Sequence, residues 1–103
     1  MPELVWTARF EADVQLVFER LETSVEGAGE KFYGDLLADL RQLEQQPWSG
    51  SRLRDSTLRR LLVLGLRYGV IYRVETRGII LHAIFDQRQD PAQIARLIRQ
   101  IEQ

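Results

Sequence analysis

The chain has 103 residues, 45% hydrophobic content, no cysteine and a formal net charge of −1. This length supports one hydrophobic core, and we expect a single domain over residues 1–103. The lack of cysteine excludes disulfides and cysteine-ligated zinc. The first twenty residues carry several charges and no apolar signal-peptide core, and the apolar runs are too short to span a membrane, so we expect a cytoplasmic protein.

Acidic and basic residues are divided along the chain. Residues 1–51 hold ten acids and four bases, whereas residues 52–88 hold eight arginines and three acids. Thirteen of the fourteen basic residues are arginine, whose planar guanidinium pairs with phosphate or carboxylate through two parallel hydrogen bonds. The second half is therefore a candidate surface for phosphates or an acidic partner, and an ordinary solvated arginine is the alternative at each single position.

The N-terminal part predicts a short edge strand at Leu4–Trp6, followed by a helix that Thr7 can cap through its hydroxyl. Apolar residues recur along this helix at intervals of four and three and indicate one buried face: Phe10, Val14, Val17 and Leu21. The acidic residues between them are expected to point to water: Glu11, Asp13, Glu19 and Glu22.

A turn is expected over Thr23–Gly29, where small residues and glycines interrupt the helical pattern. A second apolar period begins at Phe32 or Tyr33 and continues to Leu43. Pro47 ends it, because proline cannot continue a helix. The two helices should form a hairpin packed on a sheet.

The segment Leu58–Arg88 predicts three successive strands. Its apolar runs are rich in β-branched and aromatic residues: Leu61–Leu64, Val70–Val74 and Ile79–Phe85. The connections Gly65–Arg67 and Glu75–Gly78 are long enough for hairpins and too short for a crossover helix. The strands should therefore form an antiparallel meander.

The C-terminal part predicts a helix that begins at Asp90-Pro91. Asp90 can cap it, Pro91 suits the first helical position, and Gln93 can reach back to complete a capping box. Its apolar stripe should bury against the chain's own sheet, with a partner as the alternative: Ile94, Leu97, Ile98 and Ile101. The fold class is α+β, with a short strand, a helical hairpin, a three-stranded meander and a final helix.

The sequence lacks the usual patterns of catalytic chemistry. His82 is the only histidine, lies within an apolar run, and is interpreted as a packed or partly buried side chain. Neither a nucleophilic triad, a glycine-rich phosphate loop nor a cluster of metal ligands is recognisable. We therefore expect no metal, no cofactor and no enzyme of the ordinary metal-dependent or nucleophile-based kinds.

At this point the sequence resembles the ParE branch of the ParE/RelE toxin superfamily over nearly its whole length. The resemblance rests on an ordered set of segments: Trp6-Thr7, Ala12-Asp13, Leu58-Arg59, Tyr68 with Val70–Val74, and Arg88–Pro91. It implies the toxin of a bacterial type II toxin–antitoxin module. The implied partner is a cognate antitoxin, whose disordered C-terminal segment wraps the toxin and whose own DNA-binding part represses the shared promoter.

The two branches of the superfamily imply different targets. RelE-like members cut mRNA on the ribosome with basic and aromatic residues of the sheet, whereas ParE-like members poison DNA gyrase and are not enzymes. The RelE pattern has a basic residue directly after the tyrosine that opens the middle strand, where this chain has Gly69. Arginine also stays protonated at neutral pH and is a poor general acid or base. We therefore favour the ParE-like branch.

The candidate target-binding residues for gyrase, or for its bound DNA, are basic: Arg52, Arg54, Arg59, Arg60, Arg67 and Arg88. An mRNA interferase would instead use a mixed set: Arg60, Arg67, Tyr68, Tyr72 and Arg88. The chain also departs from the ParE pattern, because Gly69 replaces a common arginine and Asp86-Gln87 replaces a histidine-containing pair. A toxin with another target, or a degenerate toxin that only binds antitoxin, is therefore a further alternative.

Overall fold

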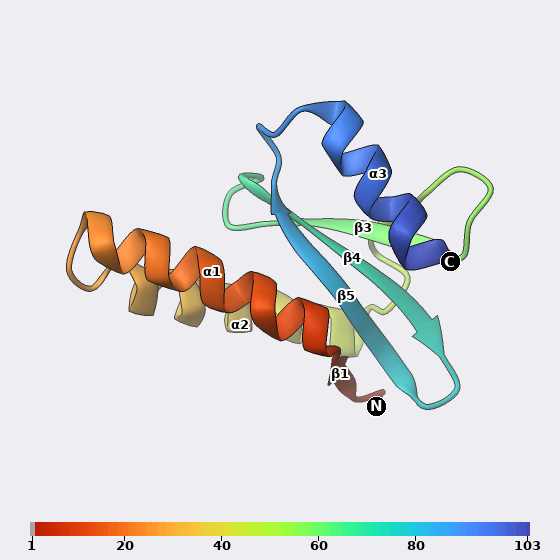
Figure 1. The fold of residues 1–103 in the computed structure, drawn as a ribbon. Helices are drawn as coiled ribbons and strands as arrows, with labels where there is room; N and C mark the ends of the chain where they lie inside the picture. The colour runs from red at the N-terminus through yellow and green to blue at the C-terminus, as the bar shows by residue number, and fades with distance from the viewer. Residues whose placement is uncertain (1) are drawn as a thin grey trace.

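The computed structural model describes residues 2–103 and contains a five-stranded sheet with helices on both faces (Figure 1). In chain order the elements are β1 Leu4–Trp6, α1 Ala8–Ser24, α2 Ala28–Gln45, β2 Ser51–Arg52, β3 Leu58–Val63, β4 Tyr68–Glu75, β5 Gly78–Asp86 and α3 Pro91–Glu102. The strand order is β1-β5-β4-β3-β2, with β1 parallel to β5 and every other pair antiparallel. This confirms the predicted α+β class and the meander.

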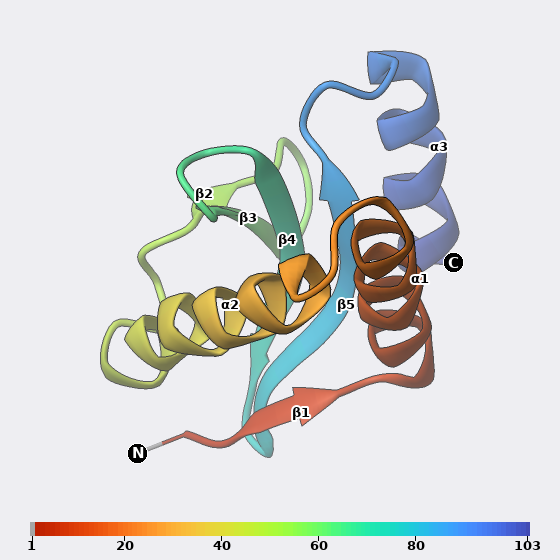
Figure 2. The same ribbon diagram turned by 90° about the vertical axis from the view of Figure 1, so that its left-hand side faces the viewer.

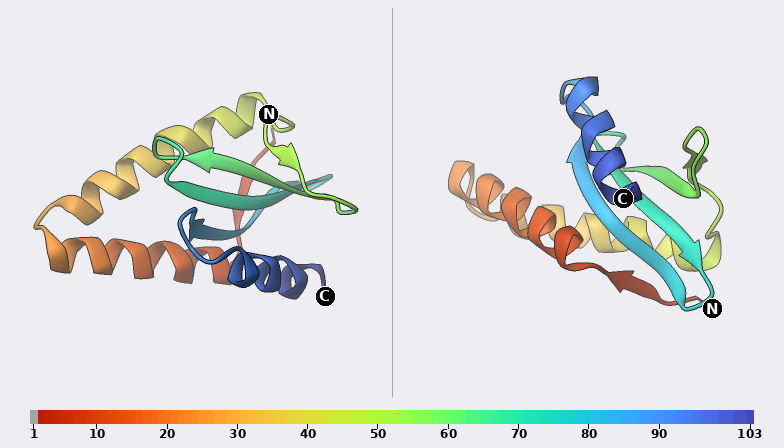
Figure 3. Two further views of the ribbon diagram at one scale, coloured as in Figure 1. Left: turned by 90° about the horizontal axis from the view of Figure 1, so that it is seen from above. Right: turned by 45° about the vertical axis from the view of Figure 1, so that its right-hand side comes forward.

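The helical hairpin covers one face of the sheet. Helices α1 and α2 diverge from their connecting turn and carry the main core between them and the strands (Figures 2 and 3). The periodic residues of both helices are buried here, as predicted: Phe10, Val14, Val17, Phe32, Leu36, Leu40 and Leu43. The strand face beneath them contributes Val63, Tyr68, Val70, Tyr72, Ile79, Leu81 and Ile84.

Helix α3 packs on the opposite face of the sheet. Its stripe is half-buried against a smaller cluster of strand residues: Leu58, Ile71, Ala83 and Phe85. The two clusters lie on opposite faces because successive side chains of a strand alternate in direction. The stripe therefore packs against the chain's own sheet, as predicted, but none of its residues is fully buried.

The turn between the first two helices is shorter than predicted, and α2 begins at Ala28 rather than at Phe32 or Tyr33. Gly27 adopts a left-handed φ of 87°, and the Glu22 carboxylate accepts bonds from the amides of Gly27 and Gly29 at 3.2 and 2.8 Å. These bonds also lower the pKa of Glu22, the bond from Gly27 most. Glu22 thus satisfies the open amides of α2 from α1, and the expectation that it only faces water is wrong.

Two helix starts have the predicted caps. The Thr7 hydroxyl accepts from the amide of Phe10 at 3.1 Å and donates to the carbonyl of Leu81 at 2.8 Å. The Asp90 carboxylate accepts from the amide of Ala92 at 3.0 Å. Gln93 does not complete the predicted capping box, because its side chain lies along the open space beside α3 instead.

Strand β2 and an irregularity in β5 were not predicted. Ser51 and Arg52 pair with Arg60 and Arg59, which adds a two-residue strand to the edge of the meander. The pairing of β4 with β5 shifts after Ile71, so His82 is the extra residue of a bulge. His82 is partly buried, as predicted, and its Nε2 atom is buried without a hydrogen-bond partner.

Among the described residues, no helix is long and apolar enough to cross a membrane.

Candidate functional site

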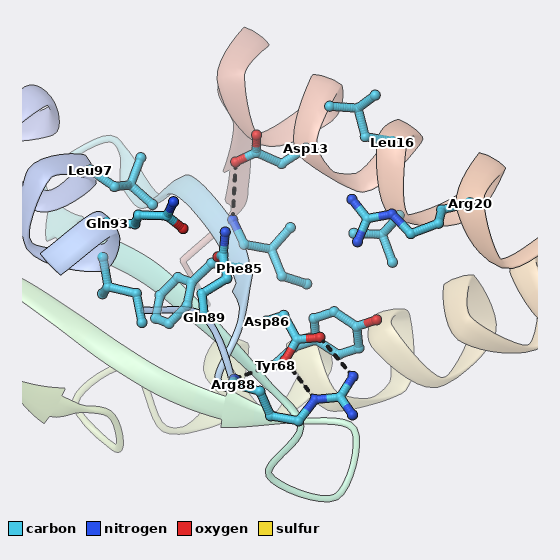
Figure 4. A pocket seen from close by; sticks show the side chains of 13 residues that line it. Asp13, Leu16, Arg20, Tyr68, Phe85, Asp86, Arg88, Gln89, Gln93 and Leu97 are labelled. Carbon is cyan, nitrogen blue, oxygen red and sulfur yellow. Dashed lines mark hydrogen bonds and ion pairs between the residues drawn. The ribbon is translucent and has the colours of Figure 1, made fainter. Parts of the chain in front are cut away.

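A groove of about 640 Å³ lies between α1, the end of β5 and α3 (Figure 4). It lies where the two helical layers approach each other past the end of β5. Its floor and walls are apolar: Leu16, Val17, Ile84, Phe85, Ile94 and Leu97. Polar side chains line its edges: Asp13, Arg20, Asp86, Arg88, Gln89 and Gln93. We refer to this space as the α1–α3 groove.

Asp13 lies at the wall of the α1–α3 groove and does not simply point to water, as the sequence had suggested. Its Oδ2 atom accepts from the backbone amide of Ile84 at 3.3 Å, which ties the middle of α1 to β5. Burial raises the pKa of Asp13, while the bond from Ile84 and the nearby Arg9 charge oppose that shift. The side chain is therefore a partly desolvated carboxylate with no cation within ion-pair distance among the described residues.

Arg20 lies seven residues after Asp13 on α1, which is about two helical turns or roughly 10.5 Å along the helix axis. Its guanidinium is exposed and makes no ion pair within the described part of the chain. Figure 4 shows Asp13 and Arg20 along the same side of the groove. One wall therefore presents an unpaired negative charge and an unpaired positive charge, two turns apart.

Arg88 closes the lower end of the α1–α3 groove in an ion pair with Asp86. Its Nη2 atom lies 3.0 Å from Asp86 Oδ2, and its Nε atom donates to Oδ1 at 3.2 Å. The hydrogen bond from Arg88 is the main reason that the pKa of Asp86 is lowered. The Arg88 side chain is still 70% exposed, so one edge of its guanidinium remains available to a partner.

A second hollow of about 490 Å³ lies between the helical hairpin and the turn that joins β3 to β4. Tyr68 lines both hollows, and the guanidinium carbon of Arg67 lies 5.5 Å from the centre of its ring. The turn is unusual because Leu64 and Leu66 have φ values of 53° and 71°. It presents an exposed Leu66 beside an exposed Arg67.

The structure divides the six predicted target-binding arginines among separate places. Arg52 and Arg59 are paired in register and therefore share the hairpin face of the sheet, with Arg54 in the loop between their strands. Arg60 pairs with Ile71 and lies on the α3 face. Arg67 and Arg88 flank Tyr68 at the opposite end of the meander. They do not form one continuous surface.

Two residues of the alternative RNA-cleaving set, Tyr68 and Tyr72, are buried in the core. Tyr72 is fully buried, and its hydroxyl donates to the carbonyl of Pro47 and accepts from the amide of Gly50, both at 2.8 Å. Burial raises its pKa. Tyr68 is only 4% exposed. The Tyr72 hydroxyl thus holds the loop after α2 and is not presented at the surface.

Gly69 occupies the position at which the RNA-cleaving pattern has a basic residue. A Cβ atom there would lie 2.6 Å from Cζ of Phe85 and 2.9 Å from Oε1 of Gln87. Phe85 belongs to the cluster under α3, so a side chain at position 69 would have to displace a ring on which that helix packs. The residue is a site of close packing, and a side chain at position 69 is excluded by the present arrangement.

The sequence reasoning missed most of the α1–α3 groove. The sequence contains one signal of this groove, because Leu16 is a large apolar residue that lies off the periodic stripe of its helix. In the structure Leu16 is 58% exposed. Among the described residues, no group of three or more histidine, aspartate or glutamate side chains is placed to hold a metal ion.

A model of the family described as ParE toxin of type II toxin-antitoxin system, parDE, matches residues 4–91. Among solved structures, the chain is similar to one from the chromosomal ParDE TA system from P. aeruginosa, with a TM-score of 0.74 and 19% sequence identity. That match covers 84% of this chain and 96% of the other, and at this identity it supports the fold alone. No curated protein matches the chain.

Proposed function

The chain belongs to the family of ParE toxins of type II toxin–antitoxin systems, and we propose that it inhibits DNA gyrase and is neutralised by an antitoxin segment bound in the α1–α3 groove. The observation that carries the second part is the groove itself, with an apolar floor and two unpaired charges on one wall. The first part rests on family membership, on the burial of Tyr68 and Tyr72, and on Gly69 in place of a basic residue.

The α1–α3 groove suits an amphipathic segment of the antitoxin. Apolar side chains of the segment would cover Leu16, Ile94 and Leu97, which are exposed or half-buried in the free toxin. A basic residue would meet Asp13 and an acidic residue would meet Arg20, so a helical segment would carry these two charges seven positions apart. A segment that orders only on binding pays an entropic cost, which keeps the antitoxin removable.

The inhibitory action is proposed to depend on protein contacts rather than on catalysis by the toxin. Tyr72 is buried and hydrogen-bonded, and Gly69 is covered by Phe85, so neither supplies a catalytic side chain at the surface. The remaining candidates are arginines, which stay protonated and serve as charge partners. Arg60, Arg67 and Arg88 are the arginines we propose for the gyrase contact, because they lie on the α3 face or at the groove end of the sheet.

Expression in cells tests this choice of target. Gyrase poisoning predicts growth arrest with broken chromosomal DNA and intact transcripts. Cleaved transcripts without DNA breaks would instead identify an mRNA interferase, and normal growth at a high level of folded protein would identify a degenerate toxin. Co-expression of the antitoxin encoded beside the toxin should restore growth in the first case.

A further inference from the structure

Trp48 is an exposed aromatic residue that neither the core nor the α1–α3 groove uses. It follows the end of α2 and is 63% exposed. The other large apolar residues that are exposed in the described chain lie on the helical hairpin or toward the far end of β3: Leu16, Val25, Tyr33, Leu62 and Leu66. Trp48 is therefore an isolated exposed ring and not part of an apolar patch.

The loop that carries Trp48 is held firmly from both sides. The buried Tyr72 hydroxyl bonds to the carbonyl of Pro47 and the amide of Gly50, which flank Trp48. Arg59 donates from Nη1 to the carbonyls of Trp48 and Gly50 at 3.2 and 2.8 Å. Gly50 packs so closely that a Cβ atom would lie 2.6 Å from the Tyr72 hydroxyl. The fold thus preorganises an exposed tryptophan, which reduces the entropic cost of binding through it.

Arg59 lies next to this ring, and Arg52 lies opposite Arg59 on the neighbouring strand. Arg59 lies over the indole, with its guanidinium carbon 5.0 Å from the ring centroid. Arg52 is its partner in the pairing of β2 with β3, so the two side chains share one face of the sheet. Like charges directly opposite each other on neighbouring strands are destabilising. Neither arginine has a carboxylate within ion-pair distance in the described part of the chain.

Both arginines are anchored by backbone carbonyls and keep free donors. Arg52 uses Nε to bond to the carbonyl of Ser56 at 3.1 Å, and Arg59 uses Nη1. The remaining guanidinium N–H groups have no hydrogen-bond partner among the described residues, with Arg52 exposed and Arg59 half-buried. A phosphate can accept two parallel hydrogen bonds from one such guanidinium. Arg54, in the loop between the two strands, adds a third exposed positive charge close by in the chain.

We propose that Trp48, Arg52 and Arg59 form a binding site for single-stranded nucleic acid, in which a base stacks on the indole and the adjoining phosphate pairs with the two guanidinium groups. A lone aromatic ring beside cations is the arrangement that binds unpaired strands without sequence preference. A duplex offers no free base face to the ring. A protein partner would be expected to meet further exposed apolar side chains around the tryptophan, and this corner has none among the described residues.

This inference goes beyond the proposed function and does not rest on it. The site lies at the β2 corner, apart from the α1–α3 groove, and shares no residue with its lining. Equilibrium binding by the purified toxin tests it without gyrase or antitoxin. Absence of nucleic-acid binding would therefore leave the proposal of gyrase inhibition unchanged. Absence of gyrase inhibition would likewise leave the proposed nucleic-acid site unchanged.

The test is a titration of the purified full chain with fluorescein-labelled oligothymidylate and oligouridylate of equal length at low salt. Fluorescence anisotropy gives the affinity, and intrinsic tryptophan fluorescence reports stacking. We expect binding of one or both strands with quenching of Trp48, and a strand preference would distinguish DNA from RNA as the ligand. Trp48→Phe should remove the quenching, because the remaining Trp6 packs against Phe10 at a centroid distance of 4.8 Å.

Substitutions at the site separate the contribution of base stacking from that of the phosphate contacts. Trp48→Ala should weaken binding by roughly 5- to 150-fold, the range expected when a base loses its stacking on an aromatic ring. Arg52→Ala should lower the slope of log affinity against log salt by about 0.7, the value for one lost phosphate contact on a single strand. The matched control is Arg96→Ala, since Arg96 is an exposed arginine on α3, across the sheet.

Three results would overturn the proposal. One is no binding of either strand by folded protein at low salt. Another is binding that persists unchanged in both Trp48→Ala and Arg52→Ala, which would place the nucleic-acid contact elsewhere. The third is a Trp48→Ala variant that binds both strands normally and instead loses a protein partner, which would identify the corner as a protein contact.

Discussion

The ring of Phe85 lies directly over the backbone of Gly69, with only 2.6 Å between its Cζ atom and the place of a Cβ atom at position 69. This relationship joins the central strand pair to the cluster under α3, because Phe85 is one of the four buried residues on which α3 packs. It also explains physically why the basic residue of RNA-cleaving relatives has no room here. The packing of Phe85 on Gly69 therefore accounts for the absence of the basic residue that is typical of the RelE-like branch.

The Gly69 contact predicts a steep cost for even a small side chain. Gly69→Ala should destabilise the protein by about 1–3 kcal/mol, since a methyl group forced into a filled space displaces Phe85. Urea denaturation measures the change. The same substitution in a Phe85→Leu background should cost less, because the clashing ring atoms are gone. Equal costs in the two backgrounds would show that the ring does not enforce glycine.

The Tyr72 hydroxyl should contribute to stability through its two bonds to the loop after α2. Tyr72→Phe removes both and leaves the carbonyl of Pro47 and the amide of Gly50 without this partner, so a loss of about 1–3 kcal/mol is expected. Thermal or urea unfolding measures it. Tyr33→Phe is the matched control, because Tyr33 is 40% exposed and its hydroxyl makes no hydrogen bond to the described residues. A cost as small as that of the control would contradict the role of Tyr72.

The elements predicted from the sequence were those whose apolar pattern is set locally. The stripes of α1 and α3 and the runs of the meander follow periods of 3.6 and 2, and Thr7 and Asp90 act as the predicted caps. Helix α2 begins earlier than its apolar period indicates, because amides at its start are satisfied by Glu22 from another helix. Strand β2 has two residues, both exposed, and therefore carries no pattern to recognise.

The candidate site was less predictable because it depends on contacts between distant segments. Asp13 differs from the neighbouring Glu11 and Glu19 through its partial burial and its bond to Ile84, which lies 71 residues away in the sequence. The division of the arginines between the two faces was, in contrast, available from the strand period. Arg59 and Arg60 are consecutive in β3, so their side chains must point to opposite faces. The arginines of β3 therefore cannot belong to one surface.

Protonation of His82 should make the folded protein less stable in mild acid. Burial, and next the nearby Arg73 charge, lower the pKa of His82 from its ordinary value of 6.5. The unfolded chain then binds the proton more readily than the folded one, so this contribution to stability is complete above pH 6.5 and is lost as the pH falls below it. His82→Gln should flatten the fall in unfolding free energy below about pH 6.5. An unchanged pH dependence in the variant would show that His82 does not cause it.

Leu16 should be important for antitoxin binding and unimportant for folding. It is 58% exposed and lines the α1–α3 groove. Leu16→Ala should weaken binding of the antitoxin encoded beside the toxin by roughly 10-fold, as for a residue at the centre of an interface, with little change in stability. Val25→Ala is the control, because Val25 is 64% exposed and lies outside the groove. Calorimetric titration measures both, and equal affinities would exclude the groove as the binding site.

The proposed gyrase contact predicts a separation between toxicity and antitoxin binding. Arg60→Ala and Arg67→Ala should each raise the toxin concentration needed for inhibition by roughly 10-fold, because arginine is frequent among residues that dominate interfaces. Neither residue lines the α1–α3 groove, so antitoxin affinity should be unchanged. Arg88 does line it, and Arg88→Ala is expected to affect both activities. Full inhibition by the Arg60→Ala, Arg67→Ala double variant would remove these residues from the contact.

The most direct measurement is a supercoiling and DNA-cleavage assay with purified gyrase and the folded toxin, alone and after addition of its antitoxin. The proposed function predicts loss of supercoiling together with an accumulation of cleaved DNA, and it predicts that antitoxin reverses both effects. Gyrase that supercoils normally, without cleaved DNA, at a large excess of folded toxin would contradict it.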